Sequence, residues 1–325
     1  MAAINAGNLT IGVCHPAYRI APELQARLPG AAVFQEYSAD AMAPRVPELD
    51  VLVISGAWRD DLLGRADNLK WIQAIGVGYN QFPLAELQRR GIRLTNAVGV
   101  NASAVSEHAI ALILALSRRL PEARDNQRRK HWRAMISDPA TREDELAGKT
   151  LGVVGLGAIG NRLATLGKAF GMRVVGTKGN PDAYQGDADT VLPSDRLGEV
   201  LDGADYVALC CPLKPETTNL IGAAELDRMK SSAYLVNVSR GQVVVEDDLI
   251  AALQRGDIAG AALDLTVEEP LRPESPLWEL PNVLITPHTG GETSRYEERL
   301  VDIIVENIRR WERGEPFIHQ VTVGS

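Results

Sequence analysis

Cysteine is scarce in this sequence, which has three cysteines among 325 residues. Cys210 and Cys211 are adjacent and Cys14 lies far from both, so the chain has neither a disulfide framework nor the spacing of a metal site. Such scarcity is typical of a protein from a reducing compartment. We therefore expect a chain without structural disulfides and without a bound metal.

Long apolar runs and an excess of basic residues are also lacking. No stretch is apolar for long enough to cross a bilayer, and the N-terminus has no basic segment of the kind that begins a signal peptide. We expect a cytoplasmic protein with no membrane partner. Lysine and arginine number 34 against 42 acidic residues, a formal charge of −8. This balance argues against a nucleic-acid partner but leaves an anionic small substrate open.

The composition is typical of a globular protein, with 45% hydrophobic and 23% charged residues, and the length is sufficient for two domains. Strand-like segments alternate with helical segments in the first hundred residues. This alternation predicts βαβ units and a parallel sheet. The predicted strands are 9–13, 31–34, 51–55, 71–75 and 92–95, and the helical segments between them are 23–28, 60–66 and 84–90.

A long apolar segment, 102–119, has alanine and leucine at helical spacing and suits a helix that leads from one domain to the next. Pro121 then interrupts the pattern. The segment 122–133 that follows is rich in charge but contains Trp132. A charged arm with a large aromatic residue fits either a solvated loop or a contact between subunits, and we favour the contact.

From Thr150 the alternation resumes and predicts six strands with crossover connections, which make a doubly wound sheet. The segment 270–281 holds four prolines and is expected to form an irregular loop. An amphipathic helix over 292–313 is expected to lead the C-terminal residues back onto the first domain. The predicted strands are 150–154, 173–177, 206–209, 233–238, 259–263 and 283–286, and the helices are 160–170, 194–202, 223–229 and 246–254.

The segment T-L-G-V-V-G-L-G-A-I-G, residues 150–160, joins a buried parallel strand to a glycine-rich turn. Gly155, Gly157 and Gly160 have the spacing G-x-G-x-x-G. The first glycine permits the tight turn, the second lets backbone approach a pyrophosphate, and the third lets helix and strand pack. The spacing alone is a weak signal. With a strand before it and a helix after it, it predicts a dinucleotide whose phosphates lie at the helix N-terminus.

An acidic residue about 20 positions beyond such glycines binds the ribose 2′-hydroxyl of NAD. Here the second strand ends in R-V-V-G-T-K-G-N, and position 178 is a lysine. A cation at this place can pair with a 2′-phosphate, although most loop lysines are simply solvated. Because Lys178 replaces the expected carboxylate, we favour NADP(H) over NAD(H).

Polar residues follow three of the predicted strands: Arg240, then Asp264 with Glu269, then His288. In an open α/β sheet, ligands bind outside the carboxyl ends of the strands, so we expect these side chains to converge. Arginine can hold a substrate carboxylate, histidine can donate a proton as hydride arrives, and a carboxylate can orient the imidazole. Taken singly, Arg240 also fits a surface ion pair, Glu269 a solvated loop acid, and His288 a helix-cap or loop histidine. Together they predict the reduction of a 2-keto acid.

Short segments of the sequence, in their order along the chain, resemble those of the D-isomer-specific 2-hydroxyacid dehydrogenases. The resemblance covers nearly the whole chain and is strongest from Gly76 to Gly291. An ordered set of this size is highly specific. The matching segments are I-G-V-G-Y-N (75–80), N-A-S-A-V-S-E-H-A (101–109), G-L-G-A-I-G (155–160), P-L-K-P-E-T-T-N-L-I (212–221), N-V-S-R-G (237–241), A-A-L-D (261–264), E-E-P-L (268–271) and T-P-H-T-G-G (286–291).

The resemblance implies a Rossmann nucleotide-binding domain, residues 101–290, inserted in a smaller flavodoxin-like α/β substrate domain made of residues 1–100 and 291–325. It also implies that the site lies between the two domains. Members of this family are usually homodimers through the nucleotide-binding domain. A dimer contact would account for the arm 120–147 with Trp132.

The resemblance also implies roles for single residues. Arg240 would bind the substrate carboxylate, with help from the backbone N–H groups of Val77 and Gly78. His288 would be the catalytic acid and base, with Glu269 as its partner. The cofactor would be lined by Gly155, Gly157, Ala158, Ile159, Gly160, Lys178, Cys211, Pro212, Thr217, Val238, Ser239, Asp264, His288 and Gly290, with Asp264 near the nicotinamide amide.

The sequence departs from the usual pattern of the family at three places. Lys178 stands where NAD-preferring members have an aspartate, and in this respect the sequence resembles the glyoxylate/hydroxypyruvate reductase branch. Thr266 and Val267 stand where Val-Phe is frequent, which changes the wall beside Glu269. The cysteine pair that precedes Pro212 replaces a frequent His-Leu, and we expect it to pack or to touch the cofactor rather than to react.

We therefore predict an NADPH-preferring oxidoreductase that converts short 2-keto acids into D-2-hydroxy acids, with glyoxylate or hydroxypyruvate as the leading substrates. A phosphoglycerate-type dehydrogenase is one alternative. Another is an NAD(P)-sensing binding protein on the same scaffold, because such a protein can keep Arg240, Glu269 and His288. Formate oxidation would be expected to carry glutamine in place of Glu269 and has no support.

Overall fold

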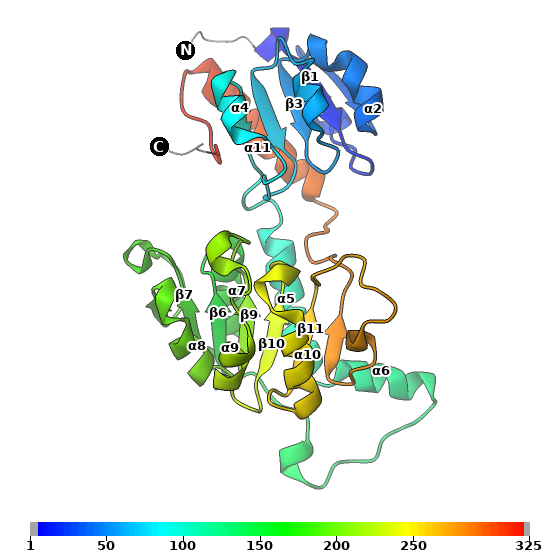
Figure 1. The fold of residues 1–325 in the computed structure, drawn as a ribbon, viewed down its shortest axis with the longest axis vertical. Helices are drawn as coiled ribbons and strands as arrows, with labels where there is room; N and C mark the ends of the chain where they lie inside the picture. The colour runs from blue at the N-terminus through cyan, green and yellow to red at the C-terminus, as the bar shows by residue number, and fades with distance from the viewer. Residues whose placement is uncertain (1–5, 322–325) are drawn as a thin grey trace. The chain divides into compact units, whose positions relative to one another are not determined.

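The computed structural model describes residues 6–321 of the chain. The chain divides into two compact units, Met1–Val100 with Thr293–Ser325, and Asn101–Glu292. Each unit is built on a parallel sheet covered by helices, which confirms the predicted α/β fold class (Figure 1). No helix among the residues from 6 to 321 is long and apolar enough to cross a membrane.

The first unit has a five-stranded sheet in the order β2-β1-β3-β4-β5, and all neighbouring strands are parallel. The predicted strands and helices are all present, and one short helix, α2, was not predicted. The strands are β1 (Thr10–Cys14), β2 (Ala32–Glu36), β3 (Val51–Ile54), β4 (Trp71–Ala74) and β5 (Arg93–Thr95). The helices are α1 (Ala21–Arg27), α2 (Ala39–Met42), α3 (Asp60–Leu63), α4 (Leu84–Arg89) and α11 (Tyr296–Glu312).

The C-terminal helix α11 forms part of the core of this first unit. Leu300, Ile304 and Ile308 of the helix are completely buried in the same apolar cluster as the strands β1 and β3. Their spacing of four residues puts all three on one face of the helix. At the end of α11, the indole of Trp311 lies edge-on to that of Trp71 in β4. Segments from both ends of the chain therefore share one core.

The second unit has a seven-stranded parallel sheet in the order β12-β11-β10-β9-β6-β7-β8. Six of these strands were predicted, and the short edge strand β8 was not. The strands are β6 (Thr150–Val154), β7 (Arg173–Thr177), β8 (Thr190–Leu192), β9 (Tyr206–Leu209), β10 (Tyr234–Asn237), β11 (Gly260–Leu263) and β12 (Val283–Ile285). The helices are α5 (Ala102–Ser117), α6 (Leu120–Arg128), α7 (Ala158–Ala169), α8 (Leu197–Gly203), α9 (Ala223–Arg228) and α10 (Glu246–Arg255).

The order of strands in this sheet reverses at β6. After β6 the chain adds β7 and β8 on one side, then crosses to the other side and adds β9 to β12. Ligands of open α/β sheets bind at such a reversal, outside the carboxyl ends of the strands. The residues that follow β6, β9, β10, β11 and β12 therefore gather along the edge where a ligand is expected.

The helix α6 and the loop after it extend away from the sheet of the second unit (Figure 1). Between α5 and α6, Arg119 has a left-handed backbone with φ of 48°, and Pro121 lies in the first turn of α6, where its missing N–H needs no partner. No residue of α6 is buried. Beyond it, Trp132 is 97% exposed and Met135 is 96% exposed. This arm presents two large apolar side chains that nothing within the described chain covers.

Candidate active site

The glycine-rich turn between β6 and α7 has the shape that a bound pyrophosphate needs. Gly155 has a φ of +99°, which residues with a side chain rarely adopt, and a Cβ on Gly160 would lie 2.2 Å from the carbonyl oxygen of Gly155. A Cβ on Gly157, in contrast, would meet no atom within 4 Å. Gly157 and Ala158 are exposed at the start of α7, where free N–H groups attract anions. The turn therefore fits a dinucleotide.

Lys178 follows the strand β7 and lies beside the glycine-rich turn. Its Nζ donates a hydrogen bond of 2.9 Å to the carbonyl oxygen of Leu156, and its side chain is half-buried. At the end of the same strand, the hydroxyl of Thr177 accepts the N–H of Gly155 at 3.1 Å. The lysine is therefore held at the turn, and the exposed residues Gly179 and Asn180 that follow carry no acidic side chain.

The loop after β10 carries Arg240 and is held by the buried side chain of Asn237. The Asn237 amide donates to the carbonyl oxygen of Arg240 at 2.9 Å, and its oxygen accepts the N–H of Ser239 at 3.0 Å. A Cβ on Gly241 would lie 2.0 Å from the carbonyl group of Thr266, so this loop packs backbone to backbone against the loop after β11. Arg240 itself is exposed, and its guanidinium has no carboxylate partner among the described residues.

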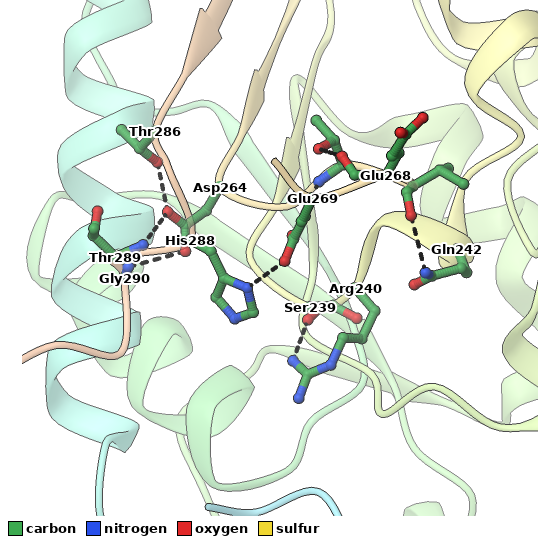
Figure 2. A network of polar contacts seen from close by, with 12 residues as sticks. Ser239, Arg240, Gln242, Asp264, Glu268, Glu269, Thr286, His288, Thr289 and Gly290 are labelled. Atoms are coloured by element: carbon green, nitrogen blue, oxygen red, sulfur yellow. Dashed lines mark hydrogen bonds and ion pairs between the residues drawn. The ribbon is translucent and has the colours of Figure 1, made fainter. Parts of the chain in front are cut away.

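His288 and Glu269 are joined by a hydrogen bond of 2.7 Å between Nδ1 and Oε2. The backbone of His288 is left-handed, with φ of 54°, and its N–H donates to the carbonyl oxygen of Asp264 at 2.8 Å. In Figure 2 the side chains of His288 and Arg240, from the loops after β12 and β10, extend toward one another. Because Nδ1 is taken by the carboxylate, Nε2 is the nitrogen that can face a substrate.

Asp264 anchors the turn that carries His288. Its carboxylate accepts the hydroxyl of Thr286 at 2.6 Å and the backbone N–H groups of Thr289 and Gly290 at 3.0 and 2.9 Å (Figure 2). Burial acts to raise the pKa of Asp264, but the nearby imidazole of His108 and the hydrogen bonds from Thr286 and Gly290 outweigh it, so the pKa lies below its ordinary value. The carboxylate is therefore ionised at neutral pH and serves only as an acceptor.

The remaining cofactor candidates lie after β9 and β10. The hydroxyl of Ser239 donates to the carbonyl oxygen of Cys211 at 2.5 Å, and the hydroxyl of Thr217 donates to that of Pro212 at 2.6 Å. Val238 and Cys211 are buried. Burial is the main cause of the raised pKa of the Cys211 thiol, which therefore stays protonated. These segments lie at the same edge of the sheet as the glycine-rich turn, because all the strands are parallel.

Val77 and Gly78 belong to the first unit and follow the strand β4. Both are exposed, and the carbonyl oxygen of Val77 accepts the side-chain amide of Asn96 at 2.8 Å. The backbone N–H groups that the family resemblance implies as contacts of the substrate carboxylate are thus on an exposed loop. Their role stays a prediction.

The sequence did not single out Asn237, His108 or Thr286. All three belong to segments that carry the family resemblance, but none of them has a signal of its own, because a buried or half-buried polar residue fits many structural roles. His108 lies 178 residues before its partner Thr286, which no spacing within the chain reveals. Among the described residues, no group of three or more His, Cys, Asp or Glu side chains could hold a metal ion.

Comparisons with known proteins show what the whole chain is similar to. The profile of the family described as D-isomer specific 2-hydroxyacid dehydrogenase, NAD binding domain, matches residues 110–290. A glyoxylate reductase of Korarchaeum cryptofilum is 34% identical over 282 residues, which cover 86% of this chain and 84% of that protein. A D-3-phosphoglycerate dehydrogenase of Methanocaldococcus jannaschii is also 34% identical, over 85% of this chain but 52% of its own length. A solved D-isomer specific 2-hydroxyacid dehydrogenase from Xanthobacter autotrophicus Py2, in complex with NADPH and MES, is 30% identical with a TM-score of 0.81, over 97% of this chain and 98% of that one.

Proposed function

The chain belongs to the D-isomer specific 2-hydroxyacid dehydrogenases, which transfer a hydride between NAD(P)H and a 2-keto acid, and we propose that its substrates are short 2-keto acids. Glyoxylate and hydroxypyruvate are the leading candidates, and the product is the 2-hydroxy acid, of D configuration where its second carbon is chiral. The observation that carries the proposal is the 2.7 Å hydrogen bond between His288 and Glu269, which leaves the imidazole Nε2 open at the edge of the nucleotide-binding sheet.

His288 is the proposed proton donor. When bound, the reduced nicotinamide supplies the hydride to the keto carbon. Charge then develops on the keto oxygen, and a proton from Nε2 of His288 neutralises it. The carboxylate of Glu269, at Nδ1, orients the ring and places a negative charge beside it. In the reverse direction the same nitrogen removes the proton from the hydroxyl group.

Arg240 is the proposed anchor of the substrate carboxylate. A guanidinium presents a planar fork that matches a carboxylate, and that of Arg240 is exposed and has no acidic partner among the residues that the structure describes. Asn237 and the close packing of Gly241 hold the backbone from which it extends. We assign the backbone N–H groups of Val77 and Gly78 to the same carboxylate.

The proposed cofactor is NADP(H) rather than NAD(H). The exposed N-terminus of α7 would hold the pyrophosphate, and Lys178 would pair with the 2′-phosphate. Support comes from the place of the Lys178 ammonium, which is fixed at the turn by the carbonyl oxygen of Leu156. The structure of the Xanthobacter relative contains NADPH, which supports the same cofactor.

The proposed assembly is a homodimer that uses the arm of residues 120–147. The exposed indole of Trp132 and the exposed side chain of Met135 support this assignment, because large apolar side chains that are fully solvated in a monomer are typical of interfaces. A second copy of the chain would cover both.

One assay tests the proposed function and separates it from its alternatives. The oxidation of NADPH and of NADH is followed by the loss of absorbance of the reduced nicotinamide. The substrates are glyoxylate, hydroxypyruvate, pyruvate and 3-phosphohydroxypyruvate, each with both cofactors. We expect turnover of glyoxylate or hydroxypyruvate. A preference for 3-phosphohydroxypyruvate would favour the phosphoglycerate-type reaction, which the Methanocaldococcus relative supports. Binding of the nucleotide without turnover of any keto acid would favour a sensing protein.

A further inference from the structure

Asp264 is linked to a second histidine, His108, to which the proposed function gives no role. His108 lies on the helix α5 and its side chain is 22% exposed. Its Nε2 lies 2.9 Å from the hydroxyl oxygen of Thr286 and 3.4 Å from Oδ1 of Asp264. The hydroxyl of Thr286 is in turn 2.6 Å from the same Oδ1. Three side chains from α5, the end of β11 and the end of β12 therefore form one polar chain.

The direction of each hydrogen bond in this chain follows from the protons available. Asp264 is ionised and can only accept, so the hydroxyl of Thr286 must donate its single proton to Asp264. The oxygen of Thr286 is then left as an acceptor. His108 therefore has to donate, which requires a proton on Nε2. The geometry fixes the protonation of His108 at this nitrogen.

The chain ends on the backbone that positions His288. Asp264 accepts the N–H groups of Thr289 and Gly290, directly after His288, and holds His288 in a left-handed conformation. Such a conformation is strained for a residue with a side chain and persists only where the surroundings hold it. The fit is close, because a Cβ on Gly290 would lie 2.7 Å from Oδ2 of Asp264 and 3.0 Å from Cδ2 of His108.

We propose that His108 is a positioning residue of the reaction. By donating its Nε2 proton to Thr286, it directs the Thr286 hydroxyl to Asp264 and keeps the Asp264 carboxylate on the turn that presents His288. This role rests on the proposed function of His288 as the proton donor. His108 acts through Thr286 and Asp264 and has no contact with the reacting atoms.

The first test is a measurement on the protein without substrate, so it does not depend on the proposed function. The ¹⁵N chemical shifts and two-bond couplings of the five histidines report which ring nitrogen carries a proton. The signal of His108 is identified by its loss in His108→Gln. We expect a proton on Nε2 in the neutral or the charged ring. An Nε2 without a proton would overturn the proposal.

The second test compares two variants of His108 in steady-state kinetics. His108→Gln keeps an N–H donor near the position of Nε2, whereas His108→Met has similar size and no donor. Loss of one hydrogen bond that acts on the reaction predicts a fall in kcat of roughly five- to tenfold in His108→Met, with both KM values changed by less than about twofold. His108→Gln should restore most of kcat. Glu107→Gln, an exposed neighbour on α5, is the control and should behave as the unmutated protein.

A double-mutant cycle with Thr286→Val tests whether His108 acts through Thr286. Because valine removes both the acceptor and the donor of residue 286, His108→Met should cause no further loss of kcat in that background. An equal loss in both backgrounds, or unchanged kcat in His108→Met, would overturn the positioning role. If the unmutated protein reduces no keto acid, the proposed function fails instead, and the ¹⁵N measurement still decides the direction of the hydrogen bonds.

Discussion

The carboxylate of Glu269 lies 2.7 Å from Nδ1 of His288, and both side chains remain accessible, at 39% and 48% exposure. An ion pair this exposed contributes about 0–1 kcal/mol to folding. Its contribution to stability is therefore too small to explain why the two loops meet. The bond supports the proposed orientation of the imidazole for proton transfer, because a ring held at Nδ1 presents Nε2 in one direction.

The substitution Glu269→Gln should separate these two roles. Glutamine keeps an oxygen for Nδ1 but removes the negative charge beside the ring that carries the transferred proton. We expect kcat to fall by about 10²-fold, with the Kd of NADPH and the Tm nearly unchanged. Steady-state kinetics, fluorescence titration and thermal unfolding measure the three quantities. Glu268→Gln, at the neighbouring position, is a matched control, because the carboxylate of Glu268 pairs with Arg272 and not with His288. Equal kinetics of the two variants would contradict the role of Glu269.

The substitution Lys178→Asp should change the choice of cofactor. A carboxylate there can accept the ribose 2′-hydroxyl of NAD and repels a 2′-phosphate. Loss of a charged contact and gain of repulsion predict that the ratio of kcat/KM for NADPH to that for NADH falls by about 10²-fold or more. Lys168→Gln, which removes a lysine from the other end of α7, is the control. An unchanged ratio in Lys178→Asp would mean that another residue binds the 2′-phosphate.

Asp264 should make the stability of the second unit depend on pH. Its pKa in the folded chain is lower than the ordinary value of 3.8, so the unfolded chain takes up the proton first as the pH falls. The stability that the carboxylate contributes is therefore complete above about pH 4–5 and is lost as the pH falls through the lower, folded pKa. Asp264→Asn removes this contribution. Thermal unfolding over about pH 3–7 should show a Tm difference that is largest near neutrality and shrinks in acid. A constant difference would mean that ionisation of Asp264 does not contribute.

The arm with Trp132 and Met135 should control assembly. Replacing both residues by serine removes the two most exposed apolar side chains of the arm, and we expect the mass in solution to fall from that of two chains to that of one. Light scattering coupled to size exclusion measures it. Tyr37→Ser, which removes an exposed aromatic ring from the first unit, should leave the mass unchanged. A dimer that survives the double substitution would place the interface elsewhere.

Much of the fold could be predicted because strong local patterns carry it. Strands such as Val51–Ile54 and Tyr206–Leu209 are short apolar runs between helices, and α11 has a clear apolar face. Elements without such a pattern were missed. The strand β8 has three residues at an edge, and the helix α2 has four residues, too few for a period to be visible.

The sequence predicts the candidate site only where a single polar residue follows a predicted strand. Arg240, Glu269 and His288 are polar residues after strands, which a sequence reveals. The hydrogen bond of His108 to Thr286 joins residues 178 positions apart and depends on how α5 packs, so no sequence pattern contains it. The bond of Lys178 to the Leu156 carbonyl likewise depends on the side-chain conformation rather than on the residue type.

The most direct test of the account is the rate at which the His288→Gln variant reduces glyoxylate or hydroxypyruvate with NADPH. Glutamine preserves much of the shape of the side chain but cannot donate a proton as an imidazolium does. We expect kcat to fall by about 10²–10⁴-fold relative to the unmutated protein, while the Kd of NADPH changes by less than about twofold. A variant that retains full turnover would contradict the assignment of His288 as the proton donor, and with it the proposed mechanism.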